Sequence, residues 1–155
     1  MRSPIGRPDR IALEDFVDPI QYLPLPSLQR PLLDKFYREQ RSAMRTPAQA
    51  SLWVARAPQI IAGLCLSPVE DGCWLTGLLV AGTHRRAGIA SALLSRAAES
   101  VDGNLWLFCH PNLEGFYARQ GCAPCTQLPG PLADRYRRYS RHKPLVALVR
   151  APAPR

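Results

Sequence analysis

Two arginines directly before an alanine-rich helical pattern are the residues of this chain best suited to holding a ligand. Arg85 and Arg86 are followed by Gly88 and Ala90 where an apolar run gives way to that pattern. The first backbone N–H groups of a helix have no partner within it, and the positive end of the helix dipole lies there. Small residues let an anion approach the backbone, and arginines add charge-assisted hydrogen bonds. Residues 85–90 are therefore predicted to bind a phosphate group.

This stretch differs from the two commonest phosphate-binding loops. No Gly-Lys-Ser/Thr follows it, which excludes a Walker loop, and no G-x-G-x-x-G occurs, which argues against a dinucleotide-binding fold. A basic loop before an ordinary amphipathic helix would explain the stretch equally well. A second, independent motif is needed to identify the ligand.

The second motif lies downstream, after a predicted strand at 105–109. There Phe116 and Tyr117 precede Gly121 with the spacing F-Y-x-x-x-G. Together with the arginine loop, the pair resembles the pyrophosphate loop and the helix-ending signature of the GNAT superfamily, the acetyl-CoA-dependent N-acetyltransferases. The resemblance implies an α/β (α+β) fold, with a mixed, mostly antiparallel sheet, splayed central strands and helices on both faces.

The same resemblance implies how acetyl-CoA is held as co-substrate. The pantetheine arm would pair with strand Leu78-Leu79-Val80 as an extra strand does, and an N–H at its end would stabilise an oxyanion. The pyrophosphate would take the charge of Arg85 and the backbone of Arg86, Ala87, Gly88, Ile89 and Ala90. The implied reaction is direct acetyl transfer to a primary amine of a small molecule or peptide.

Tyr117 matches the tyrosine that the resemblance casts as general acid for the departing thiolate. A phenol with an ordinary pKa of about 10 is protonated at neutral pH, although a core tyrosine is the alternative here. A base is also expected, because few lysine-like amines are neutral at pH 7. His110 is one candidate, as base or coenzyme contact, and a helix-entry histidine explains it as well. Other candidates are Glu70, Asp71 and Glu114.

Periodicity predicts a mixed order of helices and strands around these motifs. In chain order they are a helix at 27–41 capped by Ser27, a β-meander at 52–57, 60–66 and 73–80, a helix at 88–99, a strand at 105–109, a helix at 111–120 and a strand at 145–149. Gly77 in the third strand indicates a bulge or a close ligand approach. The domain is expected at 27–150, and residues 151–155 are expected to form a mobile tail. Residues 1–26 are poorly assigned, and their strand candidates are Ile11-Ala12-Leu13 and a proline-rich run.

The composition fits one folded, basic domain. The 155 residues are 46% hydrophobic, and the net charge of +8 favours anionic ligands. Coenzyme A is the simpler choice over nucleic acid, because no nucleic-acid-binding motif is present. No apolar run approaches the roughly 20 residues of a bilayer span, and no secretory signal is visible, so we expect a cytoplasmic protein without a membrane partner.

Two alternatives stay open. Cys122-x-x-Cys125 with Cys109 and His110 has the spacing of a zinc or redox site, but GNAT members generally need no metal, so none is expected and the five cysteines are taken as reduced thiols. The basic stretch 135–143 is either a solvated face or a surface for an acidic acceptor, a ribose phosphate or RNA. The alternative function is thus a non-catalytic acyl-CoA or nucleic-acid binding module. The acceptor stays undetermined, and a homodimer is an open alternative because dimers are common among proteins of this kind.

Overall fold

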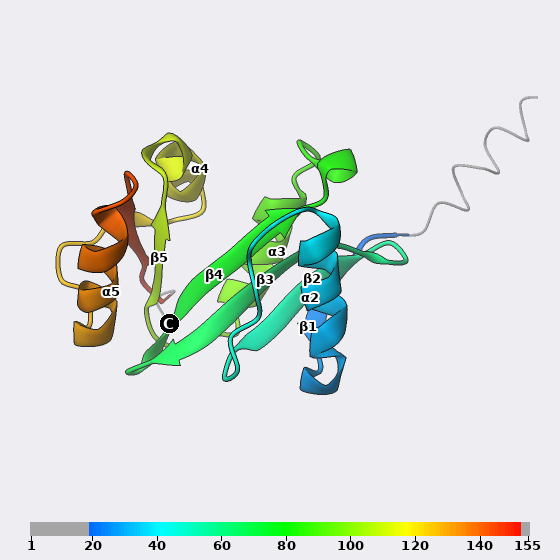
Figure 1. Cartoon of the computed structure of the whole chain (residues 1–155), viewed down its shortest axis with the longest axis horizontal. Coiled ribbons are helices and arrows are strands. Elements are labelled where there is room, and N and C mark those ends of the chain that lie inside the picture. Colours follow the sequence, from blue (N-terminus) through cyan, green and yellow to red (C-terminus); the bar gives the residue numbers. More distant parts are fainter. Residues whose placement is uncertain (1–18, 153–155) are drawn as a thin grey trace, which may run out of the picture.

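A single sheet of seven strands organises residues 19–152, which the computed structural model describes (Figure 1). In chain order the strands are β1 (Gln21–Leu25), β2 (Ser51–Arg56), β3 (Ile60–Val69), β4 (Gly72–Val80), β5 (Leu105–Cys109), β6 (Ala123–Pro124) and β7 (Val146–Arg150). Their order across the sheet is β1-β2-β3-β4-β5-β7-β6, and only β4 and β5 pair in parallel. The predicted mixed, mostly antiparallel sheet is confirmed.

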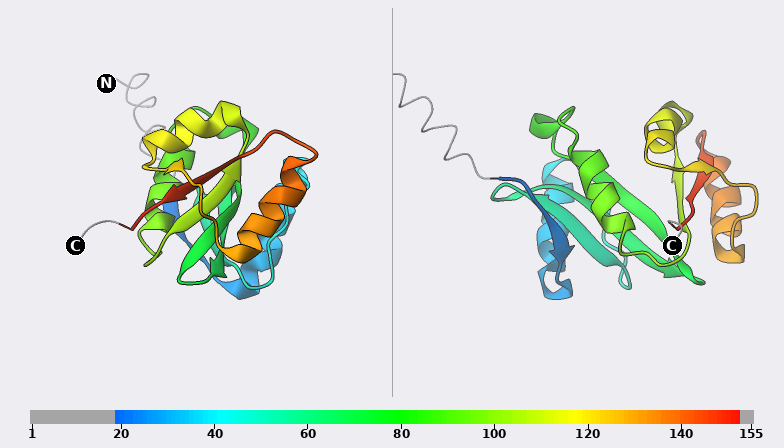
Figure 2. Two further views of the ribbon diagram at one scale, coloured as in Figure 1. Left: turned by 90° about the vertical axis from the view of Figure 1, so that its left-hand side faces the viewer. Right: turned by 180° about the vertical axis from the view of Figure 1, so that it is seen from behind.

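Helices cover both faces of this sheet, as predicted (Figure 2). They are α2 (Arg30–Glu39), α3 (Ile89–Ala98), α4 (Glu114–Arg119) and α5 (Gly130–Ser140), with 3₁₀ turns at Ser27–Gln29, Gly82–His84 and Pro111–Leu113. Because side chains alternate along a strand, Leu105 and Leu107 pack with α3 on one face, while Trp106 packs under Leu132 of α5 on the other. On that second face α2 buries Leu33 against the β1–β3 side of the sheet. No helix of this described region is long and apolar enough to cross a membrane.

The central strands diverge after a very short parallel ladder. Only Cys73 with Leu105 and Trp74 with Trp106 are paired between β4 and β5. Beyond them β4 continues beside β3 and β5 continues beside β7, so the facing edges separate (Figure 1). The predicted splay is thereby confirmed, and it leaves the end of β4 without a strand on its β5 side.

Close backbone contact holds the narrow end of this splay together. The Cys73 N–H donates to the Asn104 carbonyl at 2.9 Å. A Cβ at Gly72 would collide with the backbone of Asn104, and one at Gly103 would collide with that of Asp71. The two segments can therefore meet only because both positions lack a side chain.

A bulge in β4 lies at Gly77, as the sequence indicated. The pairing with β3 shifts between Gly63 and Cys65, and Gly77 has a φ of +70°, which only glycine adopts without strain. The Gly77 carbonyl accepts a hydrogen bond of 2.7 Å from the hydroxyl of Tyr37, whose ring is fully buried under α2. The bulge thus ties the open end of β4 to α2.

Several local expectations were wrong or incomplete. Ser27 does not cap a helix: it begins a 3₁₀ turn without a side-chain cap hydrogen bond, and α2 starts only at Arg30. Residues 21–25, within the segment left poorly assigned, form β1 at the sheet edge. Pro24 has no N–H to donate, and at an edge strand this removes no hydrogen bond from the interior of the sheet. The α5 helix occupies most of the basic stretch and was not expected. The candidate Ile11-Ala12-Leu13 and residues 153–155 of the tail lie outside the described residues.

Replacing Tyr37 by phenylalanine tests the tie between α2 and the bulge. The change leaves the half-buried Gly77 carbonyl without its donor, so we expect a loss of about 1–2 kcal/mol in the free energy of unfolding. Urea denaturation followed by circular dichroism measures it. Tyr22→Phe is the matched control, since the Tyr22 hydroxyl makes no hydrogen bond among the described residues. Equal stability of the two variants would show that the hydrogen bond from Tyr37 to the Gly77 carbonyl does not stabilise the bulge.

Candidate active site

A cavity of about 640 Å³ opens where β4, the start of α3 and α4 meet. This volume lies within the range usual for small-molecule sites. The predicted site residues that line it are Leu78, Leu79, Val80, Arg85, Arg86, Gly88, Ile89, Ala90 and Tyr117, whereas Ala87 and His110 do not line it. Sequence reasoning did not assign His84, Ser91, Leu113, Phe116 or Arg119 to the site. Each of them lies close in the sequence to a predicted site residue, and this closeness could have indicated them.

The start of α3 presents free donors to this cavity. The helix begins at Ile89, and its first internal backbone bond runs from the Ala92 N–H to the Gly88 carbonyl at 3.0 Å. The preceding N–H groups have no acceptor one turn earlier. A Cβ at Gly88 would meet nothing within 4 Å, so the space in front of the helix is open. Such an arrangement favours an anion.

The loop before α3 adds positive charge and a strained backbone. Arg85 folds back so that its Nε donates to the Val80 carbonyl at 3.2 Å. Arg86 is exposed and has a φ of +66°, a left-handed conformation that costs a non-glycine residue about 1–2 kcal/mol. His84 and Arg119 also line the cavity, and no carboxylate of the described residues does. The cavity therefore attracts negative charge.

Tyr117 lies in the wall that α4 contributes and keeps its proton. Its side chain is only 8% exposed, and the Phe116 ring packs against it with centroids 5.0 Å apart. Burial, together with the nearby Cys109 and Cys122 thiols, raises the pKa of Tyr117 above its ordinary value. Its hydroxyl makes no hydrogen bond among the described residues. Tyr117 is thus a neutral phenol with a proton to donate.

His110 is exposed and caps the 3₁₀ turn that leads into α4. Its Nδ1 accepts a hydrogen bond of 3.0 Å from the Asn112 N–H, which places the ring proton on Nε2. In this tautomer neither ring nitrogen has a free lone pair for a base. The other base candidates also lie outside the cavity, with Glu70 and Asp71 in the exposed β3–β4 turn and Glu114 at the start of α4.

The cysteines of the alternative metal site are free thiols. Cys109 and Cys122 are buried and Cys125 is half-buried. Burial raises the pKa of Cys122 to about 11, and it also raises that of Cys109. Within residues 19–152 no group of three or more ligand side chains is arranged to hold a metal ion. Neutral thiols in these positions fill the core.

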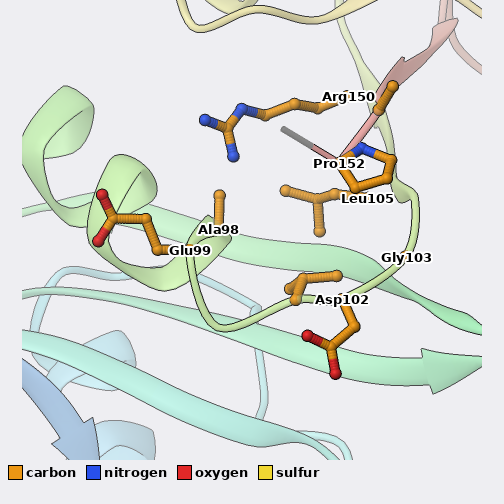
Figure 3. A pocket seen from close by; sticks show the side chains of 9 residues that line it. Ala98, Glu99, Asp102, Gly103, Leu105, Arg150 and Pro152 are labelled. Atoms are coloured by element: carbon orange, nitrogen blue, oxygen red, sulfur yellow. The ribbon is translucent and has the colours of Figure 1, made fainter. Parts of the chain in front are cut away.

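A second cavity, of about 230 Å³, lies at the far end of α3 (Figure 3). Glu99 and Asp102 line it beside Arg150 and Pro152. The C-terminal end of a helix carries negative partial charge, and the two carboxylates add to it. The two ends of α3 therefore differ in sign, and only the N-terminal end suits a phosphate.

The sequence matches the Acetyltransferase (GNAT) family over residues 17–122. The chain belongs to this family. It is accordingly an acyltransferase, and the family and fold that its motifs indicated are confirmed. No curated protein sequence matches the chain.

Solved structures with 12–16% sequence identity share the fold. Neisseria gonorrhoeae N-acetylglutamate synthase, complexed with coenzyme A and N-acetyl-glutamate, has a TM-score of 0.67 at 16% identity, covering 87% of this chain and 35% of that one. The Escherichia coli ribosomal-protein-S18-alanine N-acetyltransferase has a TM-score of 0.62 at 12% identity, covering 88% and 96%. Tetrahymena GCN5 has a TM-score of 0.63 at 12% identity, covering 87% and 98%.

The strain at Arg86 is measurable by substitution. Arg86→Gly removes the left-handed penalty, whereas Arg85→Gly changes a residue whose φ is −70°, relieves no strain and loses the exposed hydrogen bond to the Val80 carbonyl. Both variants gain the same freedom in the unfolded chain, so the Arg86 variant should be the more stable of the two by about 1 kcal/mol. Thermal unfolding of the two proteins side by side checks this difference. The opposite order would show that Arg86 is not strained.

Proposed function

We propose that this chain transfers an acetyl group from acetyl-CoA to a primary amine of a small molecule or peptide. One observation carries the proposal: a single cavity is lined by an anion-receptive helix start, an unpaired strand edge and Tyr117. These three features match the three parts of the co-substrate, which are a pyrophosphate, a chain of amides and a thioester.

The residues present fit acetyl-CoA, which supplies an activated acyl group when bound. The open space before Gly88 and the free N–H groups of the first turn of α3 suit the pyrophosphate, with Arg86 adding charge. The edge of β4 at Leu78 and Val80 has no strand on its β5 side, so its backbone groups suit the amides of the pantetheine arm. Contacts at both ends would hold the thioester carbonyl in place.

Tyr117 is proposed as the general acid. Because burial raises its pKa above the ordinary value, the phenol holds its proton at Oη throughout the neutral range. The phenol can donate this proton to the departing thiolate of the coenzyme. Without a proton donor, the thiolate is a far poorer leaving group in apolar surroundings. Because no carboxylate from residues 19–152 lines the cavity, we propose that the amine loses its proton to water.

Tyr117→Phe tests the acid. Removing the hydroxyl should lower kcat by about 100-fold and leave the affinity for coenzyme A unchanged, because the ring still fills the wall. Release of free thiol from acetyl-CoA with a panel of amines measures kcat, and calorimetry measures binding. Tyr22→Phe on β1 is the control. An unchanged kcat would exclude Tyr117, and coenzyme binding without turnover on any amine would favour a non-catalytic acyl-CoA binding module.

The pH dependence gives a separate check on Tyr117. A general acid with a raised pKa loses its proton only as the pH rises through that raised value. Deprotonation of Tyr117 should therefore cause no decrease in kcat at any pH up to 10. A falling limb near pH 8 that disappears in Tyr117→Phe would contradict this proposal.

Arg119 is proposed to bind the 3′-phosphate of the coenzyme. It lines the cavity from α4, on the wall that faces the arginine loop, and has no carboxylate partner among the described residues. Arg119→Gln should weaken coenzyme A binding about three- to fivefold and leave binding of 3′-dephospho-coenzyme A unchanged. Arg96→Gln, whose guanidinium lies over the Tyr22 ring, is the matched control. Equal weakening for both ligands would assign Arg119 a general electrostatic role instead.

A further inference from the structure

Helix α4 forms part of the wall of the 640 Å³ cavity although it is only six residues long. An isolated helix of this length is not stable in water, so its position depends on contacts with its neighbours. Tyr117 and Arg119 line the cavity from α4, and the anion-receptive start of α3 lines the same cavity. The contacts that join α4 to α3 therefore decide where the proposed acid and the proposed 3′-phosphate ligand lie relative to the phosphate-binding backbone.

A side-chain hydrogen bond joins these two helices. The Ser91 hydroxyl, in the first turn of α3, donates to Oε1 of Gln120 at 2.8 Å, and Gln120 directly follows α4. Within residues 19–152 no other side-chain hydrogen bond and no ion pair connects α3 with α4 or with Gln120. We propose that Gln120 is a positioning residue, which through Ser91 holds α4 and its two functional side chains in place at the start of α3. The inference rests on the proposed acetyl transfer and adds the contact that aligns its groups.

The backbone of Gln120 is fixed independently of its side chain. Its N–H donates to the Tyr117 carbonyl at 2.9 Å, and its carbonyl accepts a hydrogen bond of 3.1 Å from Arg150 Nε at the end of β7. The Cys122 N–H also donates to the Tyr117 carbonyl, at 3.0 Å, which closes the end of the helix. The end of α4 is thus anchored to β7, and from this anchored point the Gln120 side chain reaches α3.

Gln120 acts beside the cavity and not within it. Ser91 lines the cavity, whereas Gln120 does not, so the glutamine can align α4 without touching the coenzyme. Both residues are half-buried, which limits the competition of water for their hydrogen bond. Because Tyr117 precedes Gln120 by three residues in a short helix, a shift of the helix end moves the phenol. A displacement of about 1 Å at a reacting group can lower a rate about 100-fold.

Gln120→Leu tests the inference on the full chain. Leucine fills much of the same space but cannot accept the hydrogen bond from Ser91, so we expect kcat for acetyl transfer to fall about tenfold. The affinity for 3′-dephospho-coenzyme A should not change, because the start of α3 and the edge of β4 remain intact. Ser91→Thr keeps the hydroxyl and should retain the wild-type kcat. Ser100→Ala is the matched control and should also retain it, since it removes a hydroxyl that donates to the Ala97 carbonyl just past the far end of α3.

A double-mutant cycle separates this positioning role from a general loss of stability. Ser91→Ala and Gln120→Leu break the same hydrogen bond, so the double variant S91A/Q120L should have about the same kcat as the Q120L variant alone. If the two substitutions acted independently, their effects would multiply to a loss of about 100-fold. Multiplying effects, or an unchanged kcat in Gln120→Leu, would overturn the inference.

Hydrogen exchange examines the same contact without turnover. The backbone amides of α4 should exchange about tenfold faster in Gln120→Leu and no faster in Ser100→Ala. If exchange increases in this way but the unmodified chain acetylates no amine, the contact still holds α4 in place and the acetyl transfer fails. If amines are acetylated while kcat is the same in Gln120→Leu and in the unmodified chain, the transfer stands and this inference fails. Equal exchange of α4 in the two variants also rejects it.

Discussion

The parallel ladder between β4 and β5 consists of two residue pairs, and the functional site depends on its shortness. A longer ladder would pair the end of β4 with β5 and close the sheet over the position where the coenzyme arm is proposed to lie. A weaker junction would let the two halves of the sheet separate. The contacts of Gly72 and Gly103 with the opposite backbone hold the narrow end, and the Gly77 bulge, tied to Tyr37, redirects the open end. Backbone geometry thus creates the opening before any catalytic side chain is considered.

Electrostatics then divides the molecule by function. The start of α3 combines free backbone donors with Arg85 and Arg86, and the end of the same helix carries Glu99 and Asp102 beside a smaller cavity. A phosphate is therefore attracted to one end and repelled from the other. On the opposite face of the sheet, the Arg135 guanidinium of α5 lies over the Trp74 ring.

Much of this arrangement was predictable because it depends on local spacing. The alternation in β4 and β5, the helix start at Gly88 and the turn at Gly121, with a φ of +89°, follow from residues close together in the chain. The edge strand β1 lies in the proline-rich run that was one of two strand candidates, and the sequence left it poorly assigned because Pro24 weakens its pattern. Ser27 was misassigned because a 3₁₀ turn, rather than the helix itself, begins there. For His110 the sequence left two interpretations open, and only the structure shows that its Nδ1 accepts a hydrogen bond from the Asn112 N–H.

By itself, the sequence determined the family, the position of the helix start that is proposed to bind phosphate, and the tyrosine of the second motif, since each depends on a few neighbouring residues. Only the tertiary structure decided how far the central strands separate, that Tyr117 and Arg119 line one cavity with Arg85 and Arg86, and that Arg135 lies over Trp74. These features arise from contacts between segments far apart in the chain. Their geometry depends on packing, which spacing along a sequence does not encode.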